Sequence, residues 1–244
     1  MTPNIITFDG PSGVGKGTIS MMIAEELGYK YLDSGSLYRA LALKLYEKNN
    51  NFDEILDNLD VMMKDITIDF KYEKGQKVQI FVNDKDFTSK IRTEKVAILA
   101  SKIAIDQRAR DKLETYQRNF LIEPGLVADG RDMGTKVFSE AKIKFYLTAS
   151  VEKRAERRLN QLKDQGISAN LPNLVHKLLL RDKADTERVI SPLKPAKDAI
   201  IIDTSNISVD ELFTKTINII RENIKKYEWR FFNFTRRKYF KTTS

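Results

Sequence analysis

The glycine-rich stretch GPSGVGKGT, residues 10–18, constrains this chain more than any other feature. It follows the apolar run NIITF and precedes MMIAEEL, which has helix-forming composition, so we expect it to join a strand to a helix. Glycines let backbone N–H groups curl around phosphate oxygens, and the helix N-terminus adds its positive end. The stretch therefore predicts a phosphate-binding loop. The alternative, a glycine-rich turn without a ligand, is disfavoured by the complete spacing in this context.

The loop departs in one letter from the common pattern G-x-x-x-x-G-K-[ST]. Gly17 follows Lys16, and the hydroxyl comes one residue later, as Thr18. We expect Lys16 to reach the outer phosphates of ATP as a mobile point charge. Thr18 would meet a phosphate, and Mg²⁺ would be held mainly by ATP oxygens and water, not by a set of protein ligands. The predicted ATP-binding residues are Gly10, Pro11, Ser12, Gly13, Val14, Gly15, Lys16, Gly17 and Thr18.

The rest of the chain alternates short apolar runs with stretches of helical periodicity. The runs lie at residues 5–8, 30–32, 126–129, 143–147 and 199–203. Runs that are apolar on both faces and separated by helices predict an α/β fold with a covered parallel sheet, and ligands at the carboxyl ends of its strands. Residues 66–87 differ, because apolar and polar residues alternate there between two turns. That segment predicts a small antiparallel meander inserted in the core.

Composition narrows the classes of function. The chain has 244 residues, of which 41% are apolar, which suits one large domain with an insertion, although two small ones stay open. The lack of cysteine excludes disulfides, thiolate metal sites and a cysteine nucleophile. Of the net charge of +8, residues 225–244 carry about +6, so a nucleic-acid footprint over the whole body is not expected. With no leader pattern and no long apolar run, we expect a cytoplasmic protein without a membrane span.

The residues after the third apolar run indicate a transferase. Asp129 ends this run, but Gly130 follows it where a hydrolytic ATPase would carry a glutamate, and no guanine-reading Asn-Lys-x-Asp is present. We therefore expect the γ-phosphoryl group to pass to a second substrate. Arg131 and Asp132 come next, at the carboxyl end of the run. Their position predicts an anionic acceptor.

Two further arginine clusters support that interpretation. Arg181, Asp185 and Arg188 are spaced i, i+4 and i+7, so one helix face would present all three. Arg154, Arg157 and Arg158 begin about one turn after the strand IKFYL, near the expected phosphates. Each cluster could also be a solvated ion-pair ladder or a plain basic face, and position is what favours binding.

The motifs taken together resemble the bacterial cytidylate kinase family, from about residue 4 to about residue 225. They are GPSGVGKGT, LDSGSLYR, DGRDMGT, FYLTAS with RAERR, and RDKADTERVISPLKPAKDA. The resemblance implies a P-loop nucleoside monophosphate kinase fold: a five-stranded parallel sheet flanked by helices, an antiparallel β subdomain inserted at 62–91 and a short lid at about 152–170. The kinase domain would span 1–226, and a basic aromatic extension 227–244. G-K-G-T is the form of the loop that such kinases carry.

The resemblance also implies substrates and roles. ATP with Mg²⁺ would be the donor and CMP or dCMP the acceptor, in a monomer that needs no nucleic acid. The cytosine edge would meet Ser101, Arg110 and Asp132, with Arg108 as an alternative to Arg110. The implied CMP-binding residues are Ser34, Tyr38, Arg39, Ser101, Arg110, Asp129, Arg131, Asp132, Arg181, Asp185 and Arg188. The implied catalytic residues are Lys16, Arg131, Arg154, Arg158 and Arg188, with Arg157 on ATP.

Several alternatives remain open from the sequence. The acceptor could be adenylate, uridylate or a sugar acid, or the loop could serve a nucleotide-sensing or RNA-binding module without turnover. The single histidine, His176, is interpreted as a surface or packing residue, because a phosphate dianion needs no general base. In the tail, Tyr227, Phe231 and Phe234 have helical spacing. That spacing favours packing on the domain over binding to an anionic membrane or RNA.

Overall fold

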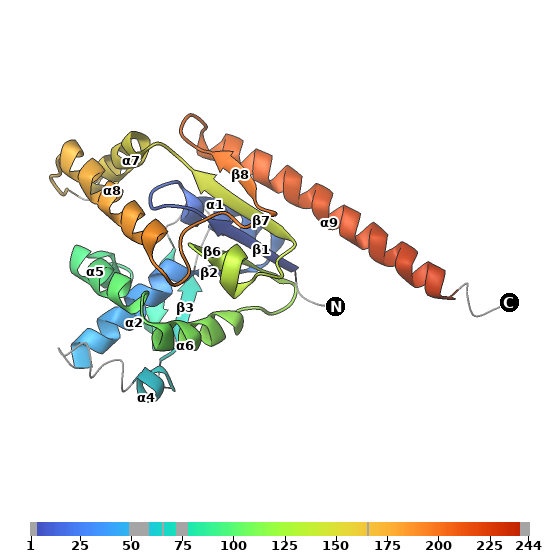
Figure 1. Ribbon diagram of the computed structural model, residues 1–244, viewed down its shortest axis with the longest axis horizontal. Helices are drawn as coiled ribbons and strands as arrows, with labels where there is room; N and C mark the ends of the chain where they lie inside the picture. Colours follow the sequence, from blue (N-terminus) through green and yellow to red (C-terminus); the bar gives the residue numbers. More distant parts are fainter. Residues whose placement is uncertain (1–3, 49–58, 65, 72–77, 165, 240–244) are drawn as a thin grey trace. The chain divides into compact units, whose positions relative to one another are not determined.

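The computed structural model describes residues 4–48, 59–64, 66–71, 78–164 and 166–239, and for residues 48, 60–62, 94 and 225–239 it describes the backbone alone. Five parallel strands form one sheet, in the spatial order β2-β6-β1-β7-β8 (Figure 1). The strands are β1 (Asn4–Asp9), β2 (Lys30–Asp33), β6 (Gly125–Gly130), β7 (Ile143–Thr148) and β8 (Ile200–Asp203). The predicted five-stranded parallel sheet is confirmed.

The central strands are apolar because both of their faces are covered. Every residue of β6 is buried, and Phe8 of β1 stacks on Phe145 of β7 with their ring centroids 4.8 Å apart. The parallel register pairs Asp9 with Gly130 and Asp33 with Asp129. Three carboxylate-bearing strand ends therefore meet at one edge of the sheet, where the glycine-rich loop also begins.

The helices begin and end at residues that satisfy their free backbone groups. Gly28 ends α1 (Lys16–Leu27) in the left-handed region and donates its N–H to the last turn. Asp33 accepts from the backbone N–H of Ser36 at 2.8 Å in the first turn of α2 (Ser34–Lys48). Thr93 and Asp106 play the same part for α5 (Glu94–Ile103) and α6 (Gln107–Arg118).

Two helices from the second half of the chain carry four of the candidate arginines, namely Arg154, Arg157, Arg158 and Arg181. They are α7 (Val151–Asp164) and α8 (Leu171–Glu187), which lie side by side in Figure 1. Asn170 caps α8, and Pro172 stands in its first turn, where a missing N–H costs nothing. The remaining short helix of the first half is α4 (Leu59–Lys64).

The predicted antiparallel insertion is confirmed as a separate three-stranded sheet. It consists of β3 (Ile68–Lys71), β4 (Gln79–Val82) and β5 (Lys85–Asp86), in that order. The turn between β4 and β5 places Asn83 and Asp84 at φ 49° and 60°, the left-handed pair of a tight hairpin. The first predicted turn, at EKGQ, lies outside the described residues.

The chain divides into two compact units, residues 1–206 and 207–244. The second holds α9 (Val209–Tyr239), which Ser208 and Glu211 begin with reciprocal side-chain to backbone hydrogen bonds, a capping box. All predicted site residues belong to the first unit. Among the described residues, none of the helices combines the length and apolar content that crossing a bilayer requires.

Candidate active site

The glycine-rich loop has the backbone that its sequence predicts. Gly10, Gly13 and Gly15 have φ of 144°, 84° and 95°, which side chains with a Cβ rarely adopt. At Gly10 a Cβ would also lie 2.1 Å from the carbonyl oxygen of Leu147, so the loop can pass the end of β7 only with glycine there. Lys16 is buried, and its Nζ donates to the Pro11 carbonyl at 2.8 Å. The Lys16 side chain is thus held by a carbonyl group of its own loop.

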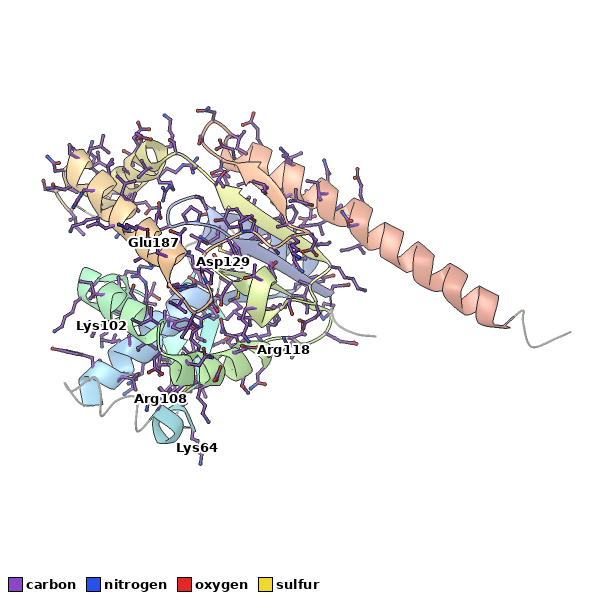
Figure 2. The ribbon with its side chains drawn as sticks, in the orientation of Figure 1. Lys64, Lys102, Arg108, Arg118, Asp129 and Glu187 are labelled. Carbon is purple, nitrogen blue, oxygen red and sulfur yellow. The ribbon has the colours of Figure 1, made fainter. Side chains whose placement is uncertain are left out.

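Carboxylates surround this lysine at the edge of the sheet. Burial raises the pKa of Asp9 to about 6 and that of Asp129 well above its usual range. Asp129, labelled in Figure 2 at the end of β6, has one buried carboxylate oxygen without a hydrogen-bond partner in the described part of the chain. A Cβ on Gly17 would lie 3.5 Å from its other oxygen. Gly17 therefore brings the start of α1 close to a carboxylate.

Asp9 connects the glycine-rich loop to the DGRDMG segment. Its two carboxylate oxygens accept from the backbone N–H groups of Met133 at 2.9 Å and of Gly134 at 2.7 Å. These bonds fix the turn that carries Arg131 and Asp132. The sequence analysis did not select Asp9, although an acidic residue directly before a glycine-rich loop was a usable signal.

The predicted acceptor-side arginines come together around Asp185. Arg131 donates from Nε to this carboxylate at 2.8 Å. Arg181 Nε and Arg188 Nη2 are buried, and neither finds a partner among the residues that the structure describes. Burial, together with the nearby Arg131 and Arg39, lowers the pKa of Arg181 to about 10. A cluster of arginines with buried N–H groups that lack partners has the charge and the donors that an anion requires.

Arg188 reaches this cluster from a different position than the sequence predicted. The helix ends at Glu187, and Arg188 is its extended C-cap, so the i, i+4, i+7 helix face is wrong for the third member. The chain then folds back, because Arg188 donates to the Ser191 carbonyl and the Leu193 N–H donates to that of Asp185. The returning loop brings Arg188 to the same anion site.

The predicted cytosine-reading residues are brought together in part. Arg110 and Asp132 form an ion pair whose side chains are only 7% and 6% exposed. Arg110 also donates to the Ala104 carbonyl at 3.0 Å, whereas Arg108 is exposed and pairs with Asp106. The geometry therefore favours Arg110 of the two arginines. Ser101 is exposed, and its hydroxyl donates to the Ala97 carbonyl at 3.0 Å within its own helix.

Three residues of α2 line the same side of the site. Ser34 and Tyr38 are buried, and burial raises the pKa of Tyr38 to about 12, so its hydroxyl stays a neutral donor. The Arg110 guanidinium lies 6.0 Å from the Tyr38 ring centroid. Arg39 donates to the Ile91 carbonyl at 3.1 Å, and burial lowers its pKa.

The three arginines of α7 differ sharply in their surroundings. Arg154 is buried and donates to the Ser12 carbonyl and to Asp182. Arg157 donates to the hydroxyl and carbonyl of Thr204. Arg158 makes a long hydrogen bond of 3.4 Å to Gln161. Of the three, only Arg158 is held by nothing more than a weak contact with its own helix. Asp182 was not selected from the sequence, where it reads as one charge in a mixed run.

Comparisons with known proteins agree with this geometry. The family model described as cytidylate kinase matches residues 6–222. The chain belongs to the cytidylate kinase family. A cytidylate kinase of Acinetobacter baylyi is 46% identical over 231 residues, which cover 92% of this chain and 100% of the relative. One from a Marinomonas species is 47% identical over 85% of this chain and 91% of its own length. The match to the family model thus covers the glycine-rich loop, the inserted sheet and the arginine cluster.

Proposed function

We propose that this chain transfers the γ-phosphoryl group of ATP to CMP or dCMP, giving ADP and CDP or dCDP. The observation that carries the proposal is the anion site at Asp185. Buried N–H groups of Arg181 and Arg188 have no partner in the described residues, beside an Arg131 that is already oriented. Donors left unsatisfied in this way are costly unless an anionic ligand accepts from them. The phosphate of a nucleoside monophosphate meets that need.

The chemistry needs no general base. A phosphomonoester with a second pKa of about 6 is largely a dianion at neutral pH, so its oxygen can attack directly. A bond forms between that oxygen and the γ-phosphorus while the bond to the bridging oxygen of ADP breaks. Catalysis then consists of aligning two repelling anions and neutralising their charge. Lys16, Arg131, Arg188 and a lid arginine supply positive charge, and one arginine can contribute about a thousandfold.

The lid arginines complete the donor side. Arg158 is the least constrained of the three on α7, since its hydrogen bond is a long one to Gln161 within the same helix. We assign it to the transferring phosphoryl group and Arg157 to ATP. Closure over the donor would also exclude water, which otherwise competes as acceptor.

Mg²⁺ would reach the site with ATP. We propose that the ion is held mainly by phosphate oxygens and water, because Mg²⁺ gives up its hydration shell reluctantly. The buried oxygen of Asp129 that has no partner among the described residues would accept from a water of the ion's hydration shell. When bound, the ion neutralises charge on the phosphate oxygens.

The base is recognised by the buried pair of Arg110 and Asp132. Asp132 accepts from the exocyclic amino group of cytosine, which uracil lacks, while Arg110 donates to the remaining acceptors of the ring. Ser101 stays a prediction, because its hydroxyl bonds within α5 in this structure. Since one chain supplies both the donor and the acceptor residues, we propose that the protein acts as a monomer. We also propose that it acts in the cytoplasm.

The test is an ADP-release assay with CMP, dCMP, UMP, AMP and dTMP as acceptors. We expect CMP and dCMP to have the highest kcat/KM. Turnover with any monophosphate excludes a sensing or RNA-binding module without catalysis. If CMP is no better than UMP or AMP, the assignment of the acceptor is wrong.

A further inference from the structure

Arg154 links the donor loop to α8, the helix that carries Arg181 and Asp185. From α7 it donates in three directions: Nε to the Ala149 carbonyl at 3.1 Å, Nη1 to the Ser12 carbonyl at 3.2 Å, and Nη2 to Asp182 at 2.6 Å. Its side chain is only 5% exposed. The planar fork of a guanidinium is suited to holding several fixed acceptors at once.

The glycine-rich loop also packs directly on this arginine. A Cβ added to Gly13 would lie 3.1 Å from the Cβ of Arg154, so the loop passes the side chain in van der Waals contact. Any shift of Arg154 would therefore displace the backbone at Ser12 and Gly13. Both belong to the predicted ATP-binding loop.

Asp182 is the far end of this link. It stands on α8, next to Arg181 and three residues before Asp185, and its side chain is 21% exposed. One oxygen accepts from Arg154, and the other is buried with no partner among the described residues. Its negative charge also acts on Arg131 and Arg181. Asp182 is thus connected to the ATP-binding loop through Arg154, and to the residues of the acceptor site through α8.

We propose that Asp182 is a positioning residue which, by holding Arg154, fixes the ATP loop relative to the helix that binds the acceptor phosphate. The proposal rests on the function proposed above and adds a residue to it. In-line transfer requires the two phosphates to be placed within a fraction of an ångström, and a misplacement of about 1 Å can cost a hundredfold in rate. A direct link between the two binding elements supplies that placement.

The proposal makes a distinctive prediction for Asp182→Asn. Although Asp182 stands on the acceptor helix, the variant should bind a non-hydrolysable ATP analogue about tenfold more weakly in the absence of any acceptor. The kcat should fall between about tenfold and a hundredfold, because Arg154 loses its charged partner. Glu187→Gln is the matched control: it removes another carboxylate from α8, and Glu187, labelled in Figure 2, is exposed. It should leave both quantities within twofold of the wild type.

A double-mutant cycle separates positioning through Arg154 from an independent role. Once Arg154→Lys has removed the fork, adding Asp182→Asn should cost less than about twofold further in analogue affinity and in kcat. Equal costs of Asp182→Asn in both backgrounds, or a loss of acceptor affinity alone, would overturn the proposal. If Asp182→Asn does not fold, Arg154→Lys by itself tests the link. An unchanged affinity for the ATP analogue in that variant would overturn it too.

The experiment also separates this proposal from the function on which it rests. Analogue binding is measured without CMP, so it reports on the link whatever the acceptor is. A preference for another monophosphate, combined with a non-additive cycle, refutes the acceptor and supports the link. Activity on CMP combined with an additive cycle supports the proposed acceptor and refutes the link.

Discussion

Among single residues, Lys16 stands in the most unusual electrostatic position. Burial lowers its pKa to about 7, and the nearby Arg131 contributes in the same direction, while Asp129, Asp9 and Asp33 oppose the shift. Phosphate oxygens would favour the charged ammonium. We therefore expect nucleotide binding to be coupled to protonation of this side chain near neutral pH.

The affinity for a non-hydrolysable ATP analogue should fall as the pH rises from 7 to 9. The charged fraction of Lys16 declines above a pKa of about 7, so protonating it on binding costs up to about 1.4 kcal/mol, or tenfold in affinity, per pH unit. The same shift makes the ligand-free protein more stable as the pH rises from about 7 towards 10.5, because the unfolded chain binds the extra proton. Isothermal titration calorimetry at three pH values measures the affinity.

Lys16→Arg is the control for that titration. An arginine stays charged throughout this pH range, and the surrounding carboxylates are the same in both proteins. The variant should therefore show a clearly shallower pH dependence of analogue affinity. Equal slopes in the two proteins would contradict the assigned role of the buried lysine.

Arg110→Lys and Arg108→Lys form a matched pair two residues apart on α6. Lysine keeps the charge beside Asp132 but lacks the fork that serves several acceptors, so Arg110→Lys should raise the KM for CMP about tenfold or more. The kcat should change less, since the base lies away from the reacting phosphates. Arg108 is exposed and pairs with Asp106, so its variant should keep the wild-type KM. A larger effect at Arg108 would transfer the role to that residue.

Among the elements, α8 and the loop that follows it in the chain illustrate how a site is built from both regular and irregular backbone. The helix supplies Arg181 and Asp185 one turn apart. The loop supplies Arg188, and Ser191 turns it back with a φ of 49°. A left-handed non-glycine residue carries strain, which persists when surrounding bonds determine it. Here the Arg188 side chain bonds the Ser191 carbonyl itself, so the turn and the anion site support one another.

Asp84→Gly should stabilise the inserted sheet. Asn83 and Asp84 form the tight turn between β4 and β5 with positive φ at both positions, and Asn-Gly is the pair that such turns favour. We expect the free energy of unfolding to rise by about 0.5–1 kcal/mol, since glycine has no Cβ to strain there. Urea denaturation measures the change. Asp84→Val, β-branched at the same position, should lower it, and a stabilising valine would show that the turn is not strained.

The sequence could predict those elements whose physical cause is local. The glycine-rich loop, the two-sided apolar strands and the alternating meander each carry a signal within a few residues, and all three were confirmed. The surroundings of Arg154 and Arg158 could not be told apart, because burial against Ser12 and Asp182 depends on contacts across 142 and 28 residues. The end of α8 at Glu187 was missed for a related reason. Arg188 leaves the helix to meet Ser191, and helical spacing alone does not contain that information.

On the scale of the whole molecule, most of the net positive charge and all of the candidate site residues lie in different parts of the chain. Residues 225–244 carry about +6 of the net +8, whereas every candidate site residue precedes residue 207. The family model ends at residue 222, although α9 continues to Tyr239. We therefore propose that the basic extension is an addition to the part of the chain that the family model matches.

Deleting residues 227–244 should leave kcat/KM for CMP within about twofold of the full chain. The physical reason is that the donor loop, the arginine cluster and the base-reading pair all lie within residues 1–206, as do the partners of Arg131, Asp9 and Arg110 in the bonds described above. The same steady-state assay compares the two proteins, and retention on anionic vesicles and on RNA is measured in parallel. Retention that is the same with and without the segment would leave the basic residues no role as an anion-binding arm. A large loss of turnover would instead show that the catalytic unit depends on the extension.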